Sequence, residues 1–548
     1  MFGVCGEDVI VRAGGWIFSR GPLATVLAAG LLRSAGGWGF AVAVAVSAFD
    51  RAGATAVGVM AAARLFPAMV AASFVGGIVD RGDRGRVVSV ACALQALCLG
   101  GAAALVLGGG SLPAIAALTA VGSVTAAAPR PALQALMPAL ANSPEELTRA
   151  TALWSAGDNG GFLLGGGAGG IAIAAVGPGA VAAGSAACVA VAGLLAVRLP
   201  VVTATELDEE HGQGALAGAL AGVRTLARTP LLRAPFVLFV GLLLLEGTTD
   251  VQFVALAITR LRMGNGGPGA LFAVLGAGGA LGGIMVLWFV RRRGYGLALG
   301  VGALAFGCSV AVAGLDGSVL ALVAMIPAGI GFALVETGVM ALVPRLADDA
   351  IVGRVYALSE MIYTGAAGAG ALVAPALIAR LGLLGSLVAV GCAMAVMTAL
   401  LLPALARVDA GQEQAARVRE LLRGLAFLAP LQLPRLERLV QEAQPTRVAA
   451  GSVILRAGEP GDTFFALERG EVEIVEYRRR QGPGTGFGEI ALLRDVPRTA
   501  TVRAVTDAEL WTITRRSFVA AVTAHGDATA LADAIVTEHL QRPVPAID

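Results

Sequence analysis

Long apolar runs alternate with short polar or Gly/Pro-rich stretches from about residue 20 to about residue 405. A helix that crosses the hydrocarbon core of a bilayer needs roughly 20 apolar residues, and each run is about that long. The longest interruption, residues 200–230, divides the runs into a first half (21–199) and a second half (231–405), which indicates a two-fold repeat. The pattern predicts twelve membrane-spanning helices, which begin near residues 22, 53, 87, 112, 147, 178, 231, 266, 297, 318, 351 and 382.

The pattern changes after residue 405. Residues 406–425 predict a helical linker, because Val418, Leu422 and Leu425 recur on one stripe. Short runs of strand-forming residues broken by turns follow, such as "GSVILRAGEPGDTFFALERGEVEIVEY", and predict β-strands. An apolar-striped helix is predicted over about 528–541. Residues 426–548 therefore predict a soluble, β-rich domain with helices at both ends.

Composition identifies the solvent of the first part as lipid. The chain is 57% hydrophobic and 14% charged, with a mean hydropathy of +0.78, whereas soluble proteins are usually about 45–50% apolar and about 25% charged. The net charge of +2 gives no signal for a polyanion, so we expect no nucleic-acid partner. Residues 1–20 lack the basic-then-apolar layout of a cleaved signal peptide and are predicted to be a cytosolic N-terminal segment.

Arginines are unevenly distributed between the predicted loops, and positive residues stay on the cytosolic side of a membrane. The odd-numbered loops hold Arg51, Arg260, Arg262 and Arg380. The even-numbered loops hold many more: Arg81, Arg84, Arg86, Arg149, Arg198, Arg224, Arg228, Arg233, Arg291, Arg292, Arg293, Arg345 and Arg354. We therefore expect a multi-pass protein of the cell (inner or plasma) membrane with both termini in the cytosol.

Several charged residues fall inside the predicted membrane helices, where charge is costly and marks candidates for function. Glu246 and Asp250 are four residues apart, hence on one helical face, and two close carboxylates raise each other's affinity for protons. The alternative is static pairing with arginines or a position near the membrane surface, which we favour for Arg130 and Glu360. The predicted transport or proton-coupling candidates are Arg33, Asp158, Glu246, Asp250 and Glu336.

The loop sequence "GGIVDRGDRGRVV" (76–88) resembles a signature of the major facilitator superfamily, a glycine followed by D-R-x-x-R-x-R, in the version seen in drug and siderophore exporters. Three later segments, "APRPALQALMP", "GALFAVLGAGGALGGIM" and "VGRVYALSEMIYTGAAGAGALVAP", agree with that branch in order and spacing. The resemblance implies an all-α membrane domain of twelve helices in two six-helix halves. It also implies secondary transport, here interpreted as proton-coupled efflux of a small organic or amphipathic molecule.

In the resembled family this loop is a latch between the halves. The implied gating residues are Asp80, Arg81, Arg84 and Arg86. Asp80 can cap a neighbouring helix N-terminus or pair with arginines, and the three arginines can also reach anionic lipid headgroups. Plain positive-inside anchoring is the alternative. The second-half loop "RRRGYG" lacks the aspartate, and Trp38 stands where the resembled exporters often carry an aspartate, so the coupling mechanism of those exporters does not transfer directly.

Glycines spaced four residues apart allow helix backbones to approach closely in lipid. They occur in the fifth predicted span (Gly165 and Gly169, Gly166 and Gly170) and in the eighth (Gly278 and Gly282, Gly279 and Gly283). In the resembled fold these two spans face each other across the halves, so we expect a smooth, mobile contact there.

A compact polar stretch, "GFGEIALLRDVPRTATVRA" (486–504), lies near the end of the chain. Gly488 allows a tight turn that aims backbone N–H groups, Glu489 supplies a carboxylate, and Arg498 supplies a guanidinium fork suited to a phosphate. The stretch resembles the phosphate-binding cassette of cyclic nucleotide-binding domains, with Glu489 and Arg498 at the family's spacing. The resemblance implies a jelly-roll-like β-barrel over residues 426–548.

Carried over to this sequence, the resemblance implies that Glu489 binds the ribose hydroxyl and Arg498 the phosphate. The backbone amides of Gly488 and Ala491 hold the sugar-phosphate, with Ile490 between them, and Thr499 contacts phosphate or base. A hydroxyl at Thr499 suits both cAMP and cGMP, and we favour cAMP as the commoner bacterial messenger. The final helix is expected to cover the base, with His539 and Arg542 as candidates.

Two functions remain open from the sequence. The first is a secondary transporter regulated by cytosolic cyclic nucleotide, and the second is a membrane-tethered cyclic-nucleotide sensor without transport activity. No nucleophile, base pair or metal-ligand cluster suggests an enzyme or a metal site. The expected partners are membrane lipids, cAMP or cGMP and a small-molecule substrate, with the chain a monomer or homodimer.

Overall fold

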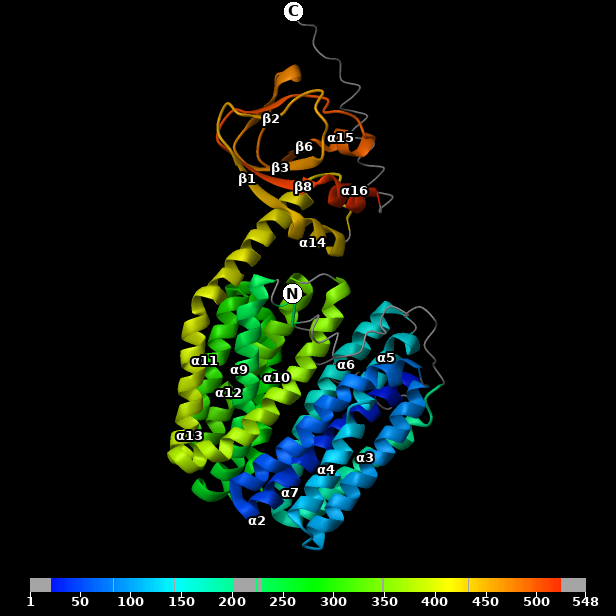
Figure 1. Cartoon of the computed structure of the whole chain (residues 1–548), viewed down its shortest axis with the longest axis vertical. Helices are drawn as coiled ribbons and strands as arrows, with labels where there is room; N and C mark the ends of the chain where they lie inside the picture. The colour runs from blue at the N-terminus through cyan, green and yellow to red at the C-terminus, as the bar shows by residue number, and fades with distance from the viewer. Residues whose placement is uncertain are drawn as a thin grey trace, which may run out of the picture. The chain divides into compact units, whose positions relative to one another are not determined.

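The computed structural model describes residues 21–81, 83–141, 143–200, 223–224, 226, 229–346, 349–431 and 433–523 (Figure 1). It divides into two compact units, Met1–Val408 and Asp409–Asp548. The predicted N-terminal segment, almost all of the central loop and the helix predicted over about 528–541 lie outside the described residues.

The first unit consists of helices, and nine of them in the described part are long and apolar enough to cross a membrane. Each predicted helix start lies within one turn of an observed helix start or of a break inside a helix. The elements are α2 (Pro22–Arg81), α3 (Arg84–Leu107), α4 (Leu112–Ala126), α5 (Pro129–Leu140), α6 (Pro144–Phe162), η1 (Leu163–Gly169), α7 (Gly170–Ala196), α9 (Pro230–Ala255), η3 (Leu256–Arg260), α10 (Gly267–Arg293), α11 (Tyr295–Ala313), α12 (Ser318–Leu346) and α13 (Asp349–Gly424).

Three of the nine apolar segments, of 51, 48 and 67 residues, are far longer than one crossing requires. Each contains a glycine whose backbone leaves the helical region: Gly53 in α2 (φ 67°), Gly177 in α7 (φ 80°) and Gly382 in α13 (φ 71°). Glycine adopts positive φ without a steric penalty, so these positions can break the helix. The apolar pattern places predicted helix starts at the same three points.

Glycine also permits close packing between the halves. A methyl group added to Gly170, at the start of α7, would lie 2.5 Å from the Cα of Gly269 in α10, and one added to Gly167 would lie 2.8 Å from the Cβ of Ala273. The predicted contact between the fifth and eighth spans is therefore present, through the predicted Gly170 and through Gly167, Gly269 and Ala273, which lie outside the predicted pairs. Gly165 instead packs against the Ala35 carbonyl of α2, and Gly278 against Ile326 of α12.

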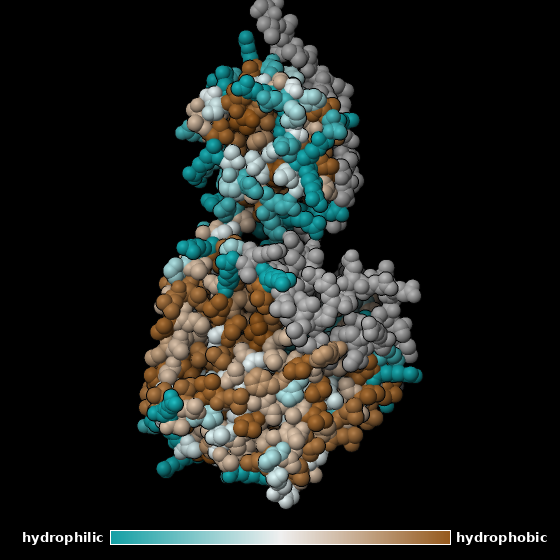
Figure 2. Space-filling model, viewed as in Figure 1, coloured by the Kyte–Doolittle hydropathy of each residue, from teal (hydrophilic) through white to brown (hydrophobic). Residues whose placement is uncertain are grey.

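The outer surface of the helical unit is apolar, as a lipid-facing surface must be. Large hydrophobic side chains such as Ile284, Leu97 and Phe74 are 74%, 72% and 68% exposed. Figure 2 shows brown, apolar residues over much of the visible face of this unit. An exposed apolar surface this extensive marks contact with a membrane.

The second unit contains two four-stranded antiparallel sheets, in the orders β1-β8-β3-β6 and β2-β7-β4-β5. No strand pairing joins the two sheets within the described residues. The strand pairing therefore does not confirm the predicted β-barrel. The elements are α14 (Leu433–Glu442), β1 (Gln444–Val448), β2 (Val453–Leu455), β3 (Thr463–Arg469), β4 (Val472–Ile474), η4 (Val475–Tyr477), β5 (Arg479–Gln481), β6 (Thr485–Phe487), α15 (Glu489–Arg494), β7 (Val502–Ala504), β8 (Ala508–Thr514) and α16 (Arg515–Thr523).

An aromatic cluster fixes β3 against the helices of this unit. Phe464 of β3 is fully buried and stacks on Phe518 of α16, with ring centroids 4.5 Å apart. Phe427, in the turn before α14, packs edge-on against both rings at 5.8 and 5.9 Å. Side chains alternate between the two faces of a strand, so Thr463 and Phe465 lie on the opposite face of β3 from this cluster.

Candidate functional sites

The polar stretch near the chain end forms a turn from β6 into the short helix α15. Gly488 is the residue before that helix and has φ 92°, a left-handed conformation that favours glycine. A methyl group at this position would also lie 2.7 Å from Nη1 of Arg498. Glycine is therefore required here both by the backbone and by the neighbouring guanidinium. Behind the turn, Glu489 and Ala491 are buried.

Arg498 lies at the centre of this site with only 6% of its surface exposed. Its Nη1 donates to the Gly488 carbonyl at 3.1 Å, and its Nη2 donates to the Thr463 carbonyl of β3 at 2.7 Å. The guanidinium carbon lies 6.0 Å from the centroid of the Phe465 ring. Gly461 closes the other side, since a methyl group there would lie 2.6 Å from Nε. A guanidinium has five N–H donors, so donors remain for a ligand.

The electrostatics of the site favour an anion that also carries a hydroxyl group. Burial lowers the pKa of the Arg498 guanidinium, while the nearby carboxylates of Asp462 and Glu489 oppose that shift. An arginine stays charged at neutral pH even so. The site therefore combines one buried cation with the buried carboxylate of Glu489. A phosphodiester can accept from the first, and a sugar hydroxyl can donate to the second.

The structure brings four of the six predicted ligand residues together: Gly488, Glu489, Ala491 and Arg498. Ile490 is half-buried on α15, and Thr499 is exposed just after Arg498. The predicted covering residues His539 and Arg542 lie outside the described residues.

The sequence analysis missed the contribution of β3 to this site, in particular the Thr463 carbonyl, the Phe465 ring and the adjoining Gly461. The signal was present in the quoted "GEPGDTFFALERG", where Gly461 and Phe465 flank the strand start. A backbone carbonyl, however, carries no residue-type signal.

Glu476 fixes the last part of the cassette. Its Oε2 accepts from the Thr501 backbone N–H at 2.7 Å, and Thr501 Oγ1 accepts from the Ala457 N–H at 3.2 Å. Burial alone would raise the pKa of Glu476, but the hydrogen bonds from Thr501 outweigh it and the pKa lies below its ordinary value. The carboxylate is therefore stabilised in its ionised form.

We predict that Glu476→Ala destabilises the second unit by about 1 kcal/mol at pH 7. A carboxyl group whose folded-state pKa is depressed stabilises the fold above its unfolded-state pKa, near 4.5, and this contribution is lost as the pH falls through the folded-state value. Thermal unfolding of the full chain should thus separate wild type from variant at pH 7 and by a smaller margin at pH 4. Glu473→Ala, which removes an ion pair with Arg503, is the matched control. An equal difference at both pH values would contradict the assignment.

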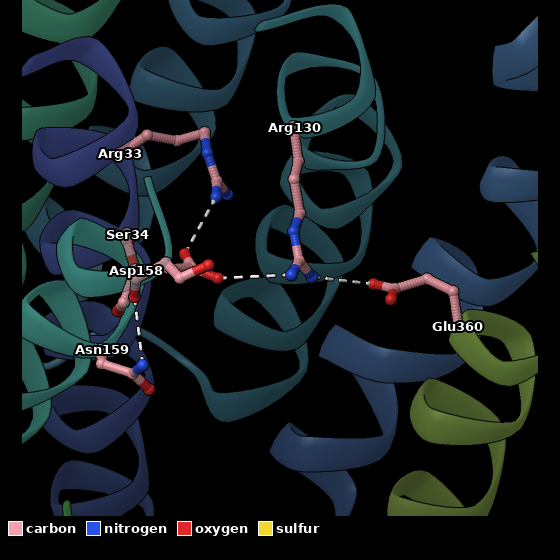
Figure 3. Close-up of polar contacts among 7 residues, drawn as sticks. Arg33, Ser34, Arg130, Asp158, Asn159 and Glu360 are labelled. Carbon is pink, nitrogen blue, oxygen red and sulfur yellow. Dashed lines mark hydrogen bonds and ion pairs between the residues drawn. The ribbon is translucent and has the colours of Figure 1, made fainter. Parts of the chain in front are cut away.

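A chain of charges connects the two halves of the helical unit (Figure 3). Arg33 of α2 lies 3.7 Å from Asp158 of α6, and Arg130 of α5 lies 3.3 Å from the other oxygen of the same carboxylate. Arg130 also donates to Glu360 of α13 at 3.2 Å. Only this last contact of the three crosses between the halves. It is also the most exposed, with 42% and 56% of the two side chains accessible.

These contacts assign the predicted charged residues to two groups. Asp158 is paired with both Arg33 and Arg130, which is the pairing alternative. Glu246 and Asp250 lie one turn apart on α9, and Tyr363 of α13 lies beside the Glu246 carboxylate. Glu246 Oε2 is enclosed and has no hydrogen-bond partner within the described part of the chain.

Asp250 and Glu336 are both electrostatic neighbours of Glu246. Asp250 lines a cavity together with Arg64. Glu336 of α12 lies within electrostatic range of Glu246 and of Arg130. Carboxylates from two helices of the second half thus face arginines of the first half.

The predicted gating loop is partly described. Arg84 Nη1 donates to the Ala135 carbonyl of α5 at 2.9 Å, a contact within the first half. Arg86 lies 3.6 Å from Asp83, which accepts from the Gly85 N–H and so caps α3. The side chains of Asp80 and Arg81 lie outside the described residues, so the latch stays a prediction. Among the residues that the structure describes, no His, Cys, Asp and Glu side chains gather as a metal site would require.

Comparisons with known proteins assign each unit to a family. The family model of the Major Facilitator Superfamily matches residues 26–371. The model of the cyclic nucleotide-binding domain matches residues 445–525, which include the cassette.

Solved structures resemble each part. The nucleoside transporter NupG matches with a TM-score of 0.56 and 13% identity, over 71% of this chain and 98% of its own. A POT family transporter in complex with a thioalcohol-conjugated peptide matches with a TM-score of 0.56 and 14% identity, over 70% and 96%. At these identities the likeness concerns the fold alone.

The regulatory domain of Toxoplasma gondii PKA with cAMP is 27% identical over 20% of this chain, with a TM-score of 0.20, and this chain spans 45% of its length. The superfamily model covers more than half of the chain, and the described helices and cassette agree with the two family matches. The chain therefore belongs to the Major Facilitator Superfamily and carries a C-terminal cyclic nucleotide-binding domain.

Proposed function

We propose that the chain is a secondary active transporter whose activity is controlled by a cyclic nucleotide bound to its C-terminal domain, cAMP in preference to cGMP. One observation carries the proposal: the buried Arg498 guanidinium lies against the Gly488 turn with the buried Glu489 carboxylate nearby. This donor and acceptor set suits a cyclic phosphate and a ribose hydroxyl. The attached superfamily domain supplies the activity to be controlled.

The transport domain has, in this proposal, twelve crossings. The breaks at Gly53, Gly177 and Gly382 divide each of the three longest apolar helices into two spans. The excess of arginines in the even-numbered loops puts both termini, and hence the nucleotide site, on the cytosolic side of the cell membrane. The cargo is a small organic or amphipathic molecule exported in exchange for protons. The paired carboxylates Glu246 and Asp250 support proton coupling, because two close carboxylates raise each other's affinity for protons.

Flux in proteoliposomes tests the proposal. Purified chain is reconstituted with a proton gradient, and efflux of candidate amphipathic molecules is measured with and without cAMP on the side of the C-terminal domain. We expect cAMP to change the flux by about 5- to 150-fold, the range of a coupling of about 1–3 kcal/mol. Arg498→Ala should abolish this response but keep the basal flux. Nucleotide binding without any flux would instead identify a membrane-tethered sensor.

A further inference from the structure

A partly open cavity lies between the two halves of the helical unit. Its wall includes aromatic rings from both halves, Trp38 and Phe162 from the first and Phe272 from the second, together with the charged side chains of Arg64 and Asp250. The rest of the lining is aliphatic apart from Phe40 and Thr119. Binding cavities for organic molecules have this composition, an apolar wall with a few polar groups that set orientation.

The aromatic rings form a continuous path across the boundary between the halves. Trp38 contacts Phe162 edge-on at 4.7 Å, and Phe162 contacts Phe272 at 6.3 Å. Phe272 in turn contacts Phe253 of α9 at 6.3 Å. The path therefore presents rings to the cavity from α2, α6 and α10, and Phe253 of α9 packs behind Phe272. A flat aromatic molecule can replace these ring–ring contacts with contacts of its own.

The indole ring of Trp38 contacts a cation, the guanidinium of Arg64. The Arg64 guanidinium carbon lies 5.5 Å from the indole centroid. This is a cation–π geometry, in which the negative face of the ring attracts positive charge. The face of Trp38 is thus a cation-binding surface in the observed conformation, and a positively charged ligand can occupy it when Arg64 moves.

The charges around the cavity do not balance. Arg33 and Arg130 are matched by Asp158 and Glu360 in the ion-paired chain of Figure 3. Among the described residues, Arg64 is the remaining cation in this part of the bundle, and it forms no ion pair with a described carboxylate. Two carboxylates lie near it: Asp250, which lines the cavity, and Glu246, one turn away on α9. Unpaired carboxylates in a low-dielectric interior need a proton or another cation.

We propose that this cavity is the substrate site and that its substrate is a planar aromatic molecule with one positive charge. This inference rests on the proposed transport function and names the class of cargo. The ring lies among Trp38, Phe162 and Phe272, and the charge lies towards Asp250. An anion of the same shape is disfavoured, because it would add a like charge beside Asp250 and Glu246, two carboxylates that share the single arginine Arg64. Protons and substrate then compete for the same carboxylates.

The size of the cavity sets a condition on entry. Its volume is about 60 Å³, less than the roughly 150 Å³ of an engineered cavity that holds benzene. A ring therefore enters only when the two halves separate around the aromatic path. Because the wall is drawn from both halves, the same rearrangement that opens access also enlarges the site.

A matched pair of ligands tests this class. Binding of 1-methylquinolinium and of naphthalene-1-carboxylate, two bicyclic rings of opposite charge, is measured by equilibrium dialysis on the purified full chain at pH 8. We expect the cation to bind at least ten times more tightly than the anion. Asp250→Asn should reduce this preference about tenfold, and Trp38→Leu should weaken binding of the cation about fivefold or more. Equal binding of both ligands, tighter binding of the anion, or binding of neither overturns the proposal.

The chain contains a matched control for the tryptophan. Trp288 of α10 has Arg292 over its ring at 5.2 Å, the same cation–π arrangement, but it is 53% exposed on the outer surface. Trp288→Leu should leave binding of 1-methylquinolinium unchanged, and a loss equal to that of Trp38→Leu overturns the site. Measuring cAMP binding on the same samples separates the two proposals. If the chain binds cAMP but not the aromatic cation, the proposed nucleotide control stands and only the proposed substrate class is wrong.

Discussion

Replacing Arg498 by alanine is expected to weaken cAMP binding by roughly 2–5 kcal/mol, because it removes the buried cation that would pair with the cyclic phosphate. That corresponds to about a 30-fold to several-thousand-fold rise in Kd. The loss is large because the site excludes water from a side chain that is only 6% exposed. Isothermal titration calorimetry on the full chain measures it directly.

Two further substitutions make this measurement specific. Arg498→Lys retains the charge but loses the planar fork of N–H donors. Its affinity for cAMP should therefore lie between that of wild type and that of Arg498→Ala. Arg479→Ala removes an exposed arginine of β5, in the other sheet, and should leave the affinity unchanged. An affinity in Arg498→Ala equal to that of wild type would remove the guanidinium from the ligand site.

Replacing Glu246 by glutamine and Asp250 by asparagine is expected to abolish transport driven by a pH gradient. Neither amide can take up or release a proton in the physiological range, and Glu246 is enclosed, so water cannot replace it as a proton carrier. The measurement is efflux from proteoliposomes with and without the gradient. Substrate exchange at equal pH should persist in Glu246→Gln.

The neighbours of these two carboxylates define the controls. Arg64, Glu336 and Tyr363 face Glu246 from three other helices, so Glu336→Gln should shift the pH dependence without removing it. Glu360→Gln changes a carboxylate that is bound to Arg130 outside this group and should leave gradient coupling in place. Gradient-driven rates equal to wild type in both Glu246→Gln and Asp250→Asn would exclude them from coupling.

The helices and the polar residues of the cassette could be predicted from the sequence, because each leaves a local signal. A lipid-crossing helix requires an unbroken apolar run, and the breaks at Gly53, Gly177 and Gly382 fall where runs meet. Gly488 and Arg498 belong to one short cassette with fixed spacing. The contact of the Thr463 carbonyl with Arg498 could not be predicted, because it depends on the pairing of β3 with β6 and β8.

Contacts between distant helices were the least predictable. Arg130 and Glu360 were expected near the membrane surface or in static pairs, but their mutual contact spans 230 positions and depends on which helices become neighbours. Gly269 was absent from the predicted glycine pairs because it has no glycine four residues away within its span. Its contact with Gly170 depends on where α10 crosses α7, which spacing along one helix does not encode.

The crossing of Gly170 with Gly269 has a practical consequence. Since the two backbones leave no space for a methyl group, alanine at either position acts as a permanent spacer of one carbon atom. Gly269→Ala would keep α10 away from α7 without a crosslink, a bound inhibitor or any change of charge. Such a variant offers a chemically minimal way to trap one stage of the transport cycle for spectroscopy or imaging.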